Sequence, residues 1–216
     1  MTAWSVLVAR LGGLRSLRAR RRRRRRNRLS DARGFIAAWD RPGHPRNAWP
    51  TVLLETAFGN INSSGDPANR MAPALGPAHP DFERSLERGV RDLVLAMVRR
   101  HGWITYTSCE GHRYRRTALR PTLRMVGILP RDDAQRAQIV AILQPIVDDV
   151  GLWWSPVQPR LRCEPLVSGE DSFTAINLVF DRAWGPWSIY FGWVDRLYRR
   201  VVARLEARAS RAGYAR

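Results

Sequence analysis

The sequence DFERSLERGVRDLVLAMVRRHGWITYTS, residues 81–108, contains the two patterns that decide the fold. In its first part, apolar residues recur at the spacing of one helix face. Its last six residues, Trp103–Ser108, are mostly β-branched or aromatic, which is typical of a strand. The pattern therefore predicts a helix from an N-cap at Asp81 to about His101, a stop at Gly102 and a strand directly after it.

The segments after residue 108 continue this mixture of helices and strands. The expected elements are a strand at 122–129, a helix at 132–150 that Pro145 should kink, a hairpin of 153–157 with 161–167, a strand at 173–180 and a helix from 186 to about 209. This order contains no repeated strand–helix–strand unit. It predicts an α+β fold, a two-layer sandwich of a mostly antiparallel sheet with three main helices.

The chain before residue 81 is less regular. A short helix is expected within residues 30–40, and residues 51–58 fit either a strand or a helix. Residues 59–80 are rich in Gly, Asn, Ser and Pro and predict a long loop. We therefore divide the chain into a basic, disordered arm at 1–28, an irregular extension and loop at 29–80, and an α+β domain at 81–210.

The charge of the chain is strongly positive and unevenly distributed. The 216 residues include 37 arginines, no lysine and 19 acidic residues, a net charge of +18. Eleven of the arginines and none of the acidic residues lie in residues 1–28. Such a block repels itself and binds phosphate backbones without sequence preference. This arm has two alternative interpretations. It is a non-functional extension produced by a coding bias toward arginine, or it is a targeting peptide.

The composition excludes several classes of protein. A hydrophobic content of 44% is enough for a core, so a fully disordered chain is excluded. Two cysteines cannot form a disulfide framework and suit a reducing, cytoplasmic compartment. No apolar run reaches the roughly 18 residues of a membrane-spanning helix, so we expect no membrane partner. The excess of arginine instead indicates a nucleic-acid partner, with RNA favoured.

The segment TYTSCEGH, residues 105–112, is the strongest candidate for a functional site. A strand delivers a thiol, a carboxylate and an imidazole to one tight turn. Gly111 lets that turn adopt a positive φ and lets a ligand approach the backbone. We predict catalytic roles for Cys109, Glu110 and His112, with the last two handling protons, and ligand-binding roles for Ser108 and Gly111.

Arginines follow this motif and also line the last predicted helix. The first group would surround Cys109 with positive potential, which would lower the pKa of its thiol. The second group forms a one-sided row that is typical of a phosphate-tracking surface, although a solvated helix face has the same pattern. We predict nucleic-acid contacts for Arg113, Arg115, Arg116, Arg120, Arg199, Arg200 and Arg204.

Three chemical interpretations of the motif stay open. Cys109 can be a nucleophile with His112 as its base. Alternatively, both residues are half of a metal site that Cys163 and Glu164 complete. In the third interpretation, Ser108 and backbone N–H groups hold an anionic ligand. A buried cysteine at a strand end is the purely structural alternative, and the sequence alone assigns no metal ligands.

A helix, a short turn and a strand that ends in T-x-x-S-C-x-G resemble the methyltransferase family of wybutosine synthesis in tRNA. The resemblance covers residues 81–113 and rests on Thr105, Ser108, Cys109, Gly111 and Arg113. It implies an RNA substrate and S-adenosylmethionine as cofactor. The family's Ser-Ser-Cys-Ser-Gly-Arg core is replaced here at Thr107, Glu110 and His112. The S-C-E-G-H segment also resembles one in uncharacterised bacterial and phage proteins.

Tryptophans cluster at 153–154 and 184–193. Core packing is the expected role of most of them, while an exposed pair would stack on unpaired bases or contact a protein partner. This feature supports a second hypothesis beside the RNA-modifying enzyme. The chain is then a non-catalytic nucleic-acid-binding or scaffold subunit of a larger complex.

Overall fold

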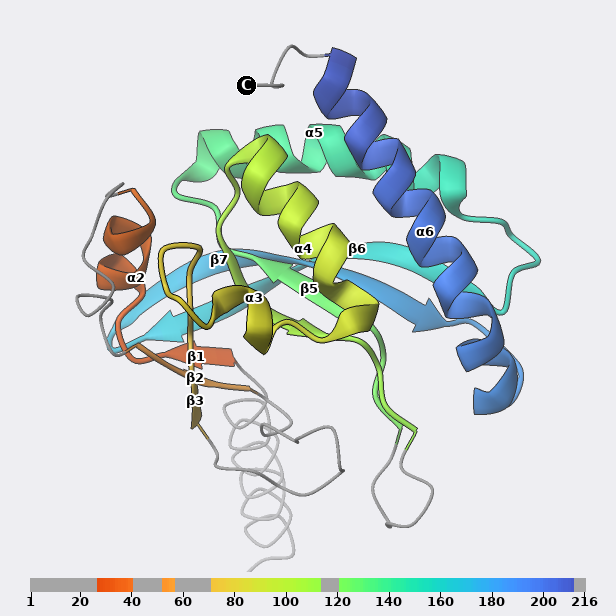
Figure 1. Ribbon diagram of the computed structural model, residues 1–216, viewed down its shortest axis with the longest axis horizontal. Helices are drawn as coiled ribbons and strands as arrows, with labels where there is room; N and C mark the ends of the chain where they lie inside the picture. The colour runs from red at the N-terminus through yellow and green to blue at the C-terminus, as the bar shows by residue number, and fades with distance from the viewer. Residues whose placement is uncertain (1–26, 41–51, 57–70, 114–120, 212–216) are drawn as a thin grey trace, which may run out of the picture.

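The computed structural model describes residues 27–40, 52–56, 71–113 and 121–211, and the structural statements below concern these ranges (Figure 1). In chain order the elements are β1 (Asn27–Leu29), α2 (Ala32–Trp39), β2 (Leu53–Glu55), β3 (Met71–Pro73), α3 (Phe82–Ser85), α4 (Arg88–His101), β4 (Thr105–Cys109), β5 (Met125–Ile128), α5 (Asp133–Val150), β6 (Val157–Ser168), β7 (Asp171–Arg182) and α6 (Trp187–Arg211). Helices and strands are present in the proportions of an α+β protein, as predicted.

The strands form one seven-stranded sheet in the order β3-β2-β1-β6-β7-β5-β4. Neighbouring strands are antiparallel except β1 and β6, which are parallel, so the predicted mostly antiparallel sheet is confirmed. The expected irregular extension is only partly irregular, because α2, β2 and β3 lie within residues 29–80. Asn27 and Arg28, which we assigned to the basic arm, begin β1.

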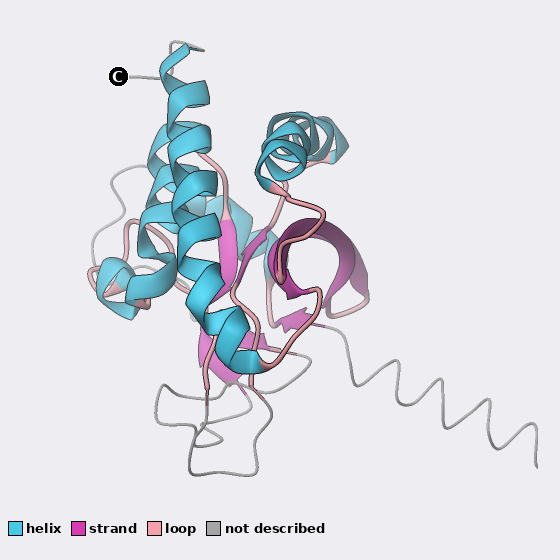
Figure 2. Cartoon of the chain, turned by 90° about the vertical axis from the view of Figure 1, so that its right-hand side faces the viewer, coloured by secondary structure: helices cyan, strands magenta, loops and turns pink. Residues whose placement is uncertain are grey.

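The main core lies between the sheet and the helices α4, α5 and α6, which share one face of it (Figures 1 and 2). Val126, Ile128 and Ile176 project from the central strands into this core. Side chains next to each other on a strand point to opposite faces, and Ala175 belongs to a second apolar cluster around α2, β1 and β2. The helices therefore cover one face, and the smaller N-terminal elements cover part of the other.

The helix predicted from Asp81 onward is broken into two. Leu86 and Glu87 have extended backbones, with ψ of 123° and 144°, and separate α3 from α4. The apolar spacing continues across the break because Leu86 is also buried, so periodicity alone could not locate it. The predicted stop is confirmed, since Gly102 caps α4 in the left-handed region with φ 64°. The break places Glu87 at the N-cap of α4.

The prediction of a hairpin within residues 153–167 is wrong. Residues 157–168 form the single strand β6, which pairs along its length with β7 through a two-residue turn at Gly169 and Glu170. Pro159 lies between the two strands that we predicted here, and proline is disfavoured in a central strand because it lacks the N–H. At this position β6 has β7 on one side only, since β1 pairs with Leu166 and Val167, so the missing N–H breaks no ladder bond.

The remaining predicted helices form as expected. Asp132 caps α5 by accepting a hydrogen bond from the Gln135 N–H, and Pro145 lies inside this helix. The last helix, α6, is the longest of the described chain. None of the helices in these ranges combines the length and the apolar character that a bilayer crossing requires.

Three buried tyrosines make hydrogen bonds that join separate elements of the fold. The Tyr198 hydroxyl accepts a hydrogen bond from the Leu93 N–H at 2.9 Å, and the Tyr106 hydroxyl donates to Asn177 Oδ1 at 2.8 Å. Tyr190, a residue of α6, is fully buried, and its hydroxyl donates a hydrogen bond to the Phe180 carbonyl of β7 at 3.0 Å. Burial raises the pKa of each of these three tyrosines to about 12.

We predict that the protein loses stability between pH 10 and pH 12. Unfolded tyrosines ionise near pH 10 and these three near pH 12, so above pH 10 the unfolded chain holds fewer protons and is favoured. Each unit of pKa difference is worth about 1.4 kcal/mol per group. Absorbance of tyrosinate near 295 nm and far-ultraviolet circular dichroism should change together. Ionisation of all tyrosines near pH 10 with an intact dichroism spectrum would contradict this expectation.

Candidate functional site

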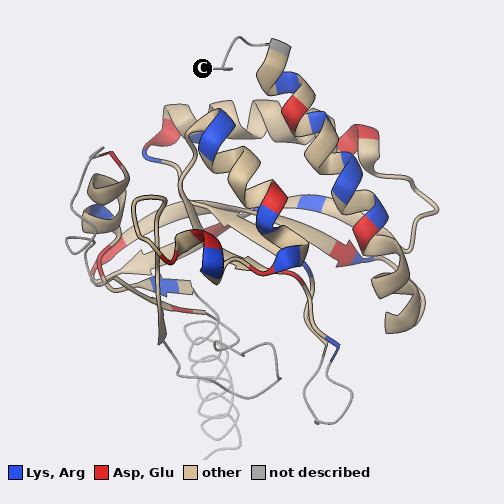
Figure 3. Ribbon diagram, in the orientation of Figure 1, with Lys and Arg blue, Asp and Glu red and all other residues tan. Residues whose placement is uncertain are grey.

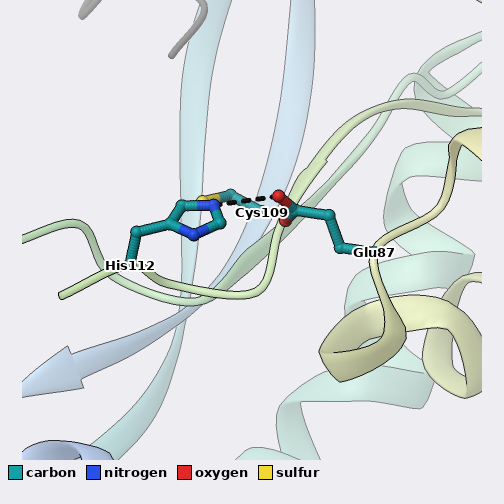
Figure 4. Close-up of side chains that lie close together, drawn as sticks. All are labelled: Glu87, Cys109 and His112. Atoms are coloured by element: carbon teal, nitrogen blue, oxygen red, sulfur yellow. Dashed lines mark ion pairs between the residues drawn. The ribbon is translucent and has the colours of Figure 1, made fainter. Parts of the chain in front are cut away.

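Three chemically different side chains meet where β4 ends and α4 begins (Figure 4). A carboxylate oxygen of Glu87, the sulfur of Cys109 and a ring nitrogen of His112 all lie within 4.8 Å of one another. The His112 Nε2 is 2.9 Å from Glu87 Oε1. We call these three residues the Glu–Cys–His cluster. The structure thus brings together Cys109 and His112, as predicted, and adds a carboxylate from a different segment.

The turn that follows β4 gives the cluster its shape. Gly111 has φ 83°, a conformation that L-residues with side chains rarely adopt, so the backbone bends at this residue. A Cβ at Gly111 would lie 3.1 Å from the backbone of Thr122 and of Arg124. The left-handed φ and the close backbone therefore favour glycine here, and the bend places His112 beside Cys109.

Every backbone N–H of this turn has a partner within the protein. The Glu110 N–H donates to Glu87 Oε2 at 2.7 Å, and the Gly111 N–H donates to the Cys109 sulfur at 3.4 Å. The His112 N–H donates to the Thr122 hydroxyl at 2.9 Å. The same hydroxyl lies 3.6 Å from the Cys109 sulfur. The turn is therefore held by all three donors that it offers.

Glu110 has a different place from the one we predicted. Its carboxylate accepts a hydrogen bond from the Gly89 N–H at 2.8 Å, so it caps the first turn of α4. A Cβ at Gly89 would come within 2.8 Å of Glu110, which shows how closely the two segments approach. Glu87, not Glu110, supplies the carboxylate beside the imidazole. Glu110 is a positioning residue in this geometry.

Arg124 is a second residue that the sequence did not identify. It is buried, with 6% of its surface exposed, and its Nε donates to the Glu110 carbonyl at 2.9 Å. Its guanidinium forms a 2.7 Å ion pair with Asp195 of α6 and lies over the Tyr198 ring at 5.0 Å. Arg124 therefore ties the Cys109–His112 turn to the last helix.

The cluster shifts the proton affinities of its members. The hydrogen bond to Cys109, the hydrogen bond to Glu87 and the charges of both groups raise the pKa of His112 to about 10, although burial acts in the opposite direction. Burial alone would raise the pKa of Glu87, but its hydrogen bonds with His112 and the Glu110 N–H lower it overall. The imidazole and the carboxylate thus stabilise each other as an ion pair.

The other predicted site residues have varied positions. Ser108 is half-buried and pairs with Val126 in the sheet, and Arg113 is exposed beside His112. On α6, Arg199 is exposed and Arg200 is half-buried, while Arg204 forms a 2.9 Å ion pair with Asp149. Three predicted arginines lie outside the described residues: Arg115, Arg116 and Arg120.

Cys163 and Glu164 are not near the cluster. Cys163 pairs with Ile176 of β7, which pairs with Ile128 at the opposite end of β5 from Met125, the partner of Cys109. The Cys163 thiol is exposed. Glu164 instead accepts a hydrogen bond from Asn177. The interpretation of a four-ligand metal site that includes Cys163 and Glu164 is therefore wrong.

The arrangement is compatible with two kinds of chemistry. A thiol in contact with an imidazole and a carboxylate has the components of a nucleophilic centre. The same three groups are also ligands for a transition metal.

Glu87 was missed because residues 82–97 follow one helical period. The signal that could have identified it is Gly89, since a glycine within a helical pattern often marks a special backbone position.

Comparison of the chain with protein-family models, with curated proteins and with solved structures finds no match. The resemblance to the wybutosine methyltransferase family therefore stays a prediction. Two hollows in the described ranges lie between α5 and α6 and beside Asp132. S-adenosylmethionine stays what the resemblance implies, and we derive no step through it.

We predict that Gly111→Ala destabilises the protein more than Gly169→Ala does. Both glycines have left-handed backbones, which costs an alanine about 1–2 kcal/mol. Only at Gly111 would the new methyl group press on neighbouring backbone, because nothing lies within 4 Å of a Cβ at Gly169. Urea denaturation of both variants measures the difference.

Gly111→Ala should also increase the rate at which a maleimide labels Cys109, because the turn must move. Labelling in a Cys163→Ser background isolates this thiol, since the chain has two cysteines. Equal losses of stability in the two alanine variants would show that packing around Gly111 does not constrain the turn.

Proposed function

We propose that this protein acts on nucleic acid, with RNA favoured, and that the Glu–Cys–His cluster is its reactive centre. The observation that carries the proposal is the convergence of a thiol, an imidazole and a carboxylate from two segments more than 20 residues apart. Structural cores rarely bury such groups together, because burying charged groups costs free energy unless they are paired. Clusters of this kind with shifted pKa values concentrate at functional sites.

The position of the cluster supports contact with a large substrate. It lies near the surface: 27% of the Glu87 side chain and 10% of the His112 side chain are exposed. A polymer chain can reach such a site without entering a deep cavity. The reacting part of the substrate would approach from the open side of the cluster, where the Glu87 side chain is most accessible.

Exposed arginines flank the cluster along the chain. Arg88 directly follows Glu87, Arg113 directly follows His112, and both are exposed. Figure 3 shows further arginines along α4 and α6, where acidic residues partly offset them. Arginine supplies affinity for phosphates but no chemistry, so we assign binding to these side chains and reactivity to the cluster. RNA is favoured over DNA because of the resemblance in residues 81–113.

A second candidate function rests on the exposed tryptophans. Trp153 is 89% exposed, and Trp154 and Trp184 are about half exposed. Trp154 packs edge-on against Trp193, over which Arg196 lies at 5.8 Å. Such a surface suits a protein partner or stacked bases. In this alternative the chain is a non-catalytic nucleic-acid-binding subunit.

We predict that the full chain binds single-stranded RNA with a steep dependence on salt. Replacing both Arg88 and Arg113 by alanine should weaken binding and lower the slope of log affinity against log salt by about 1.4, because each lost phosphate contact contributes about 0.7. Fluorescence anisotropy with a labelled RNA and the matching DNA measures both quantities. Arg33→Ala is the matched control, since Arg33 is exposed and paired with Asp171. Failure to bind either polymer at low salt would refute the proposal.

We also predict that the cluster changes the RNA covalently. Mass spectrometry of a mixed RNA pool after incubation should detect a hydrolysed product, such as a cleaved strand, with the wild type, because water is the only co-reactant in the mixture. Cys109→Ser and His112→Gln should remove the product and leave RNA binding intact. Cys163→Ser and His79→Gln are the matched controls and should retain the product. RNA that is bound but returned unchanged by the wild type would favour the non-catalytic alternative.

A further inference from the structure

The Glu–Cys–His cluster has the geometry of a three-ligand metal site. Zinc bonds sulfur, nitrogen and oxygen at about 2.0–2.3 Å, so tetrahedral ligand atoms lie about 3.3–3.8 Å from one another. The three donor atoms here are all within 4.8 Å of one another, and the His112 nitrogen is 2.9 Å from the Glu87 oxygen. Small side-chain movements therefore suffice to place all three donors around one ion.

The Cys109 and Glu87 side chains each accept a further hydrogen bond, and His112 is held through its backbone. The Cys109 sulfur accepts a hydrogen bond from the Gly111 N–H at 3.4 Å. Glu87 Oε2 accepts a hydrogen bond from the Glu110 N–H. The other carboxylate oxygen, Oε1, is the one that faces the His112 ring. The Thr122 hydroxyl accepts the His112 N–H and so fixes the start of that side chain. Ligands of protein metal sites are typically oriented by outer contacts of this kind.

The backbone donors favour ligation over an acyl-transfer role for Cys109. A nucleophile that attacks a carbonyl needs N–H groups directed at the oxyanion that develops. The three N–H groups after Cys109 already donate to Glu87, to the Cys109 sulfur and to Thr122. None of them is available for an oxyanion. The turn is built to hold the sulfur and the imidazole in place.

The donor set identifies the class of ion. Calcium and magnesium prefer oxygen ligands, whereas a thiolate with an imidazole selects zinc and similar divalent transition metals. We infer that Glu87, Cys109 and His112 bind a zinc-class divalent ion, with at least one position left for water or a substrate atom. Three protein ligands and an open position are typical of catalytic zinc, whereas structural zinc has four protein ligands. The inference deepens the proposed function, because it concerns the same cluster.

The test uses the full chain, freed of metal by dialysis against a chelator and titrated with cobalt(II) and with zinc in the absence of nucleic acid. Cobalt should bind at one equivalent and give a thiolate charge-transfer band in the near ultraviolet, which zinc displaces. Elemental analysis of the zinc-loaded protein should give one equivalent. Cys109→Ser should remove the band, and Cys163→Ser, the matched control, should keep it. Glu87→Gln and His112→Gln should each weaken binding by about 100-fold or more.

The outcomes separate the two proposals. The inference is overturned if no metal binds, if metal binds without a thiolate band, or if Cys163→Ser removes the band. If Cys109→Ser does not fold, judged by circular dichroism, the Glu87→Gln and His112→Gln titrations decide: unchanged affinity in both overturns the inference. Metal binding with no affinity for RNA would leave the inference intact and refute the proposed function alone. If the protein binds RNA but no metal, the inference is overturned and the proposed function stays intact.

Discussion

The site depends on two reciprocal hydrogen bonds between the start of α4 and the turn after β4. Glu87 accepts the Glu110 N–H, and Glu110 accepts the Gly89 N–H. Hydrogen bonds to charged groups contribute about 1.5–3 kcal/mol each, and carboxylates are further stabilised at a helix N-terminus. Because Glu110 lies between Cys109 and His112 in sequence, fixing its backbone also fixes both of these neighbours.

Arg124 extends this constraint to the rest of the molecule. A buried guanidinium is costly unless its charge is paired and its N–H groups are bonded. Arg124 meets most of this requirement through the Glu110 carbonyl, the Asp195 carboxylate and the Tyr198 ring, while its Nη1 has no hydrogen-bond partner among the described residues. These partners belong to the turn and to α6, so a movement of the last helix would be transmitted to the backbone beside Cys109.

The sequence was most informative where local patterns decide the structure. The strands around Trp103–Ser108 and Phe173–Phe180, the cap at Asp132 and the stop at Gly102 follow from periodicity and from the chemistry of single residues. Cys109 and His112 could be found because they share one turn. These features require no knowledge of what packs against them.

The remaining features depend on contacts between distant segments. Glu87 lies in a segment whose apolar residues keep one continuous helical spacing. Its place in the site becomes visible only from the end of β4, which lies beside it. Arg124 resembles any other arginine of a basic chain until its burial is known. Residues of β6 were divided between two predicted strands, because the edge position of β6 at Pro159 could not be inferred from its own neighbours. Tertiary context, not propensity, decided each of these cases.

The β6–β7 ladder has a consequence for how the chain reaches its native state. Its two strands are joined by a two-residue turn, so closing it costs little loop entropy and it can form early. The β1–β6 pairing joins residues more than 130 positions apart and gains from its contacts only after a long loop has closed. Growth of the sheet from the centre outward would therefore complete the β1–β3 edge late.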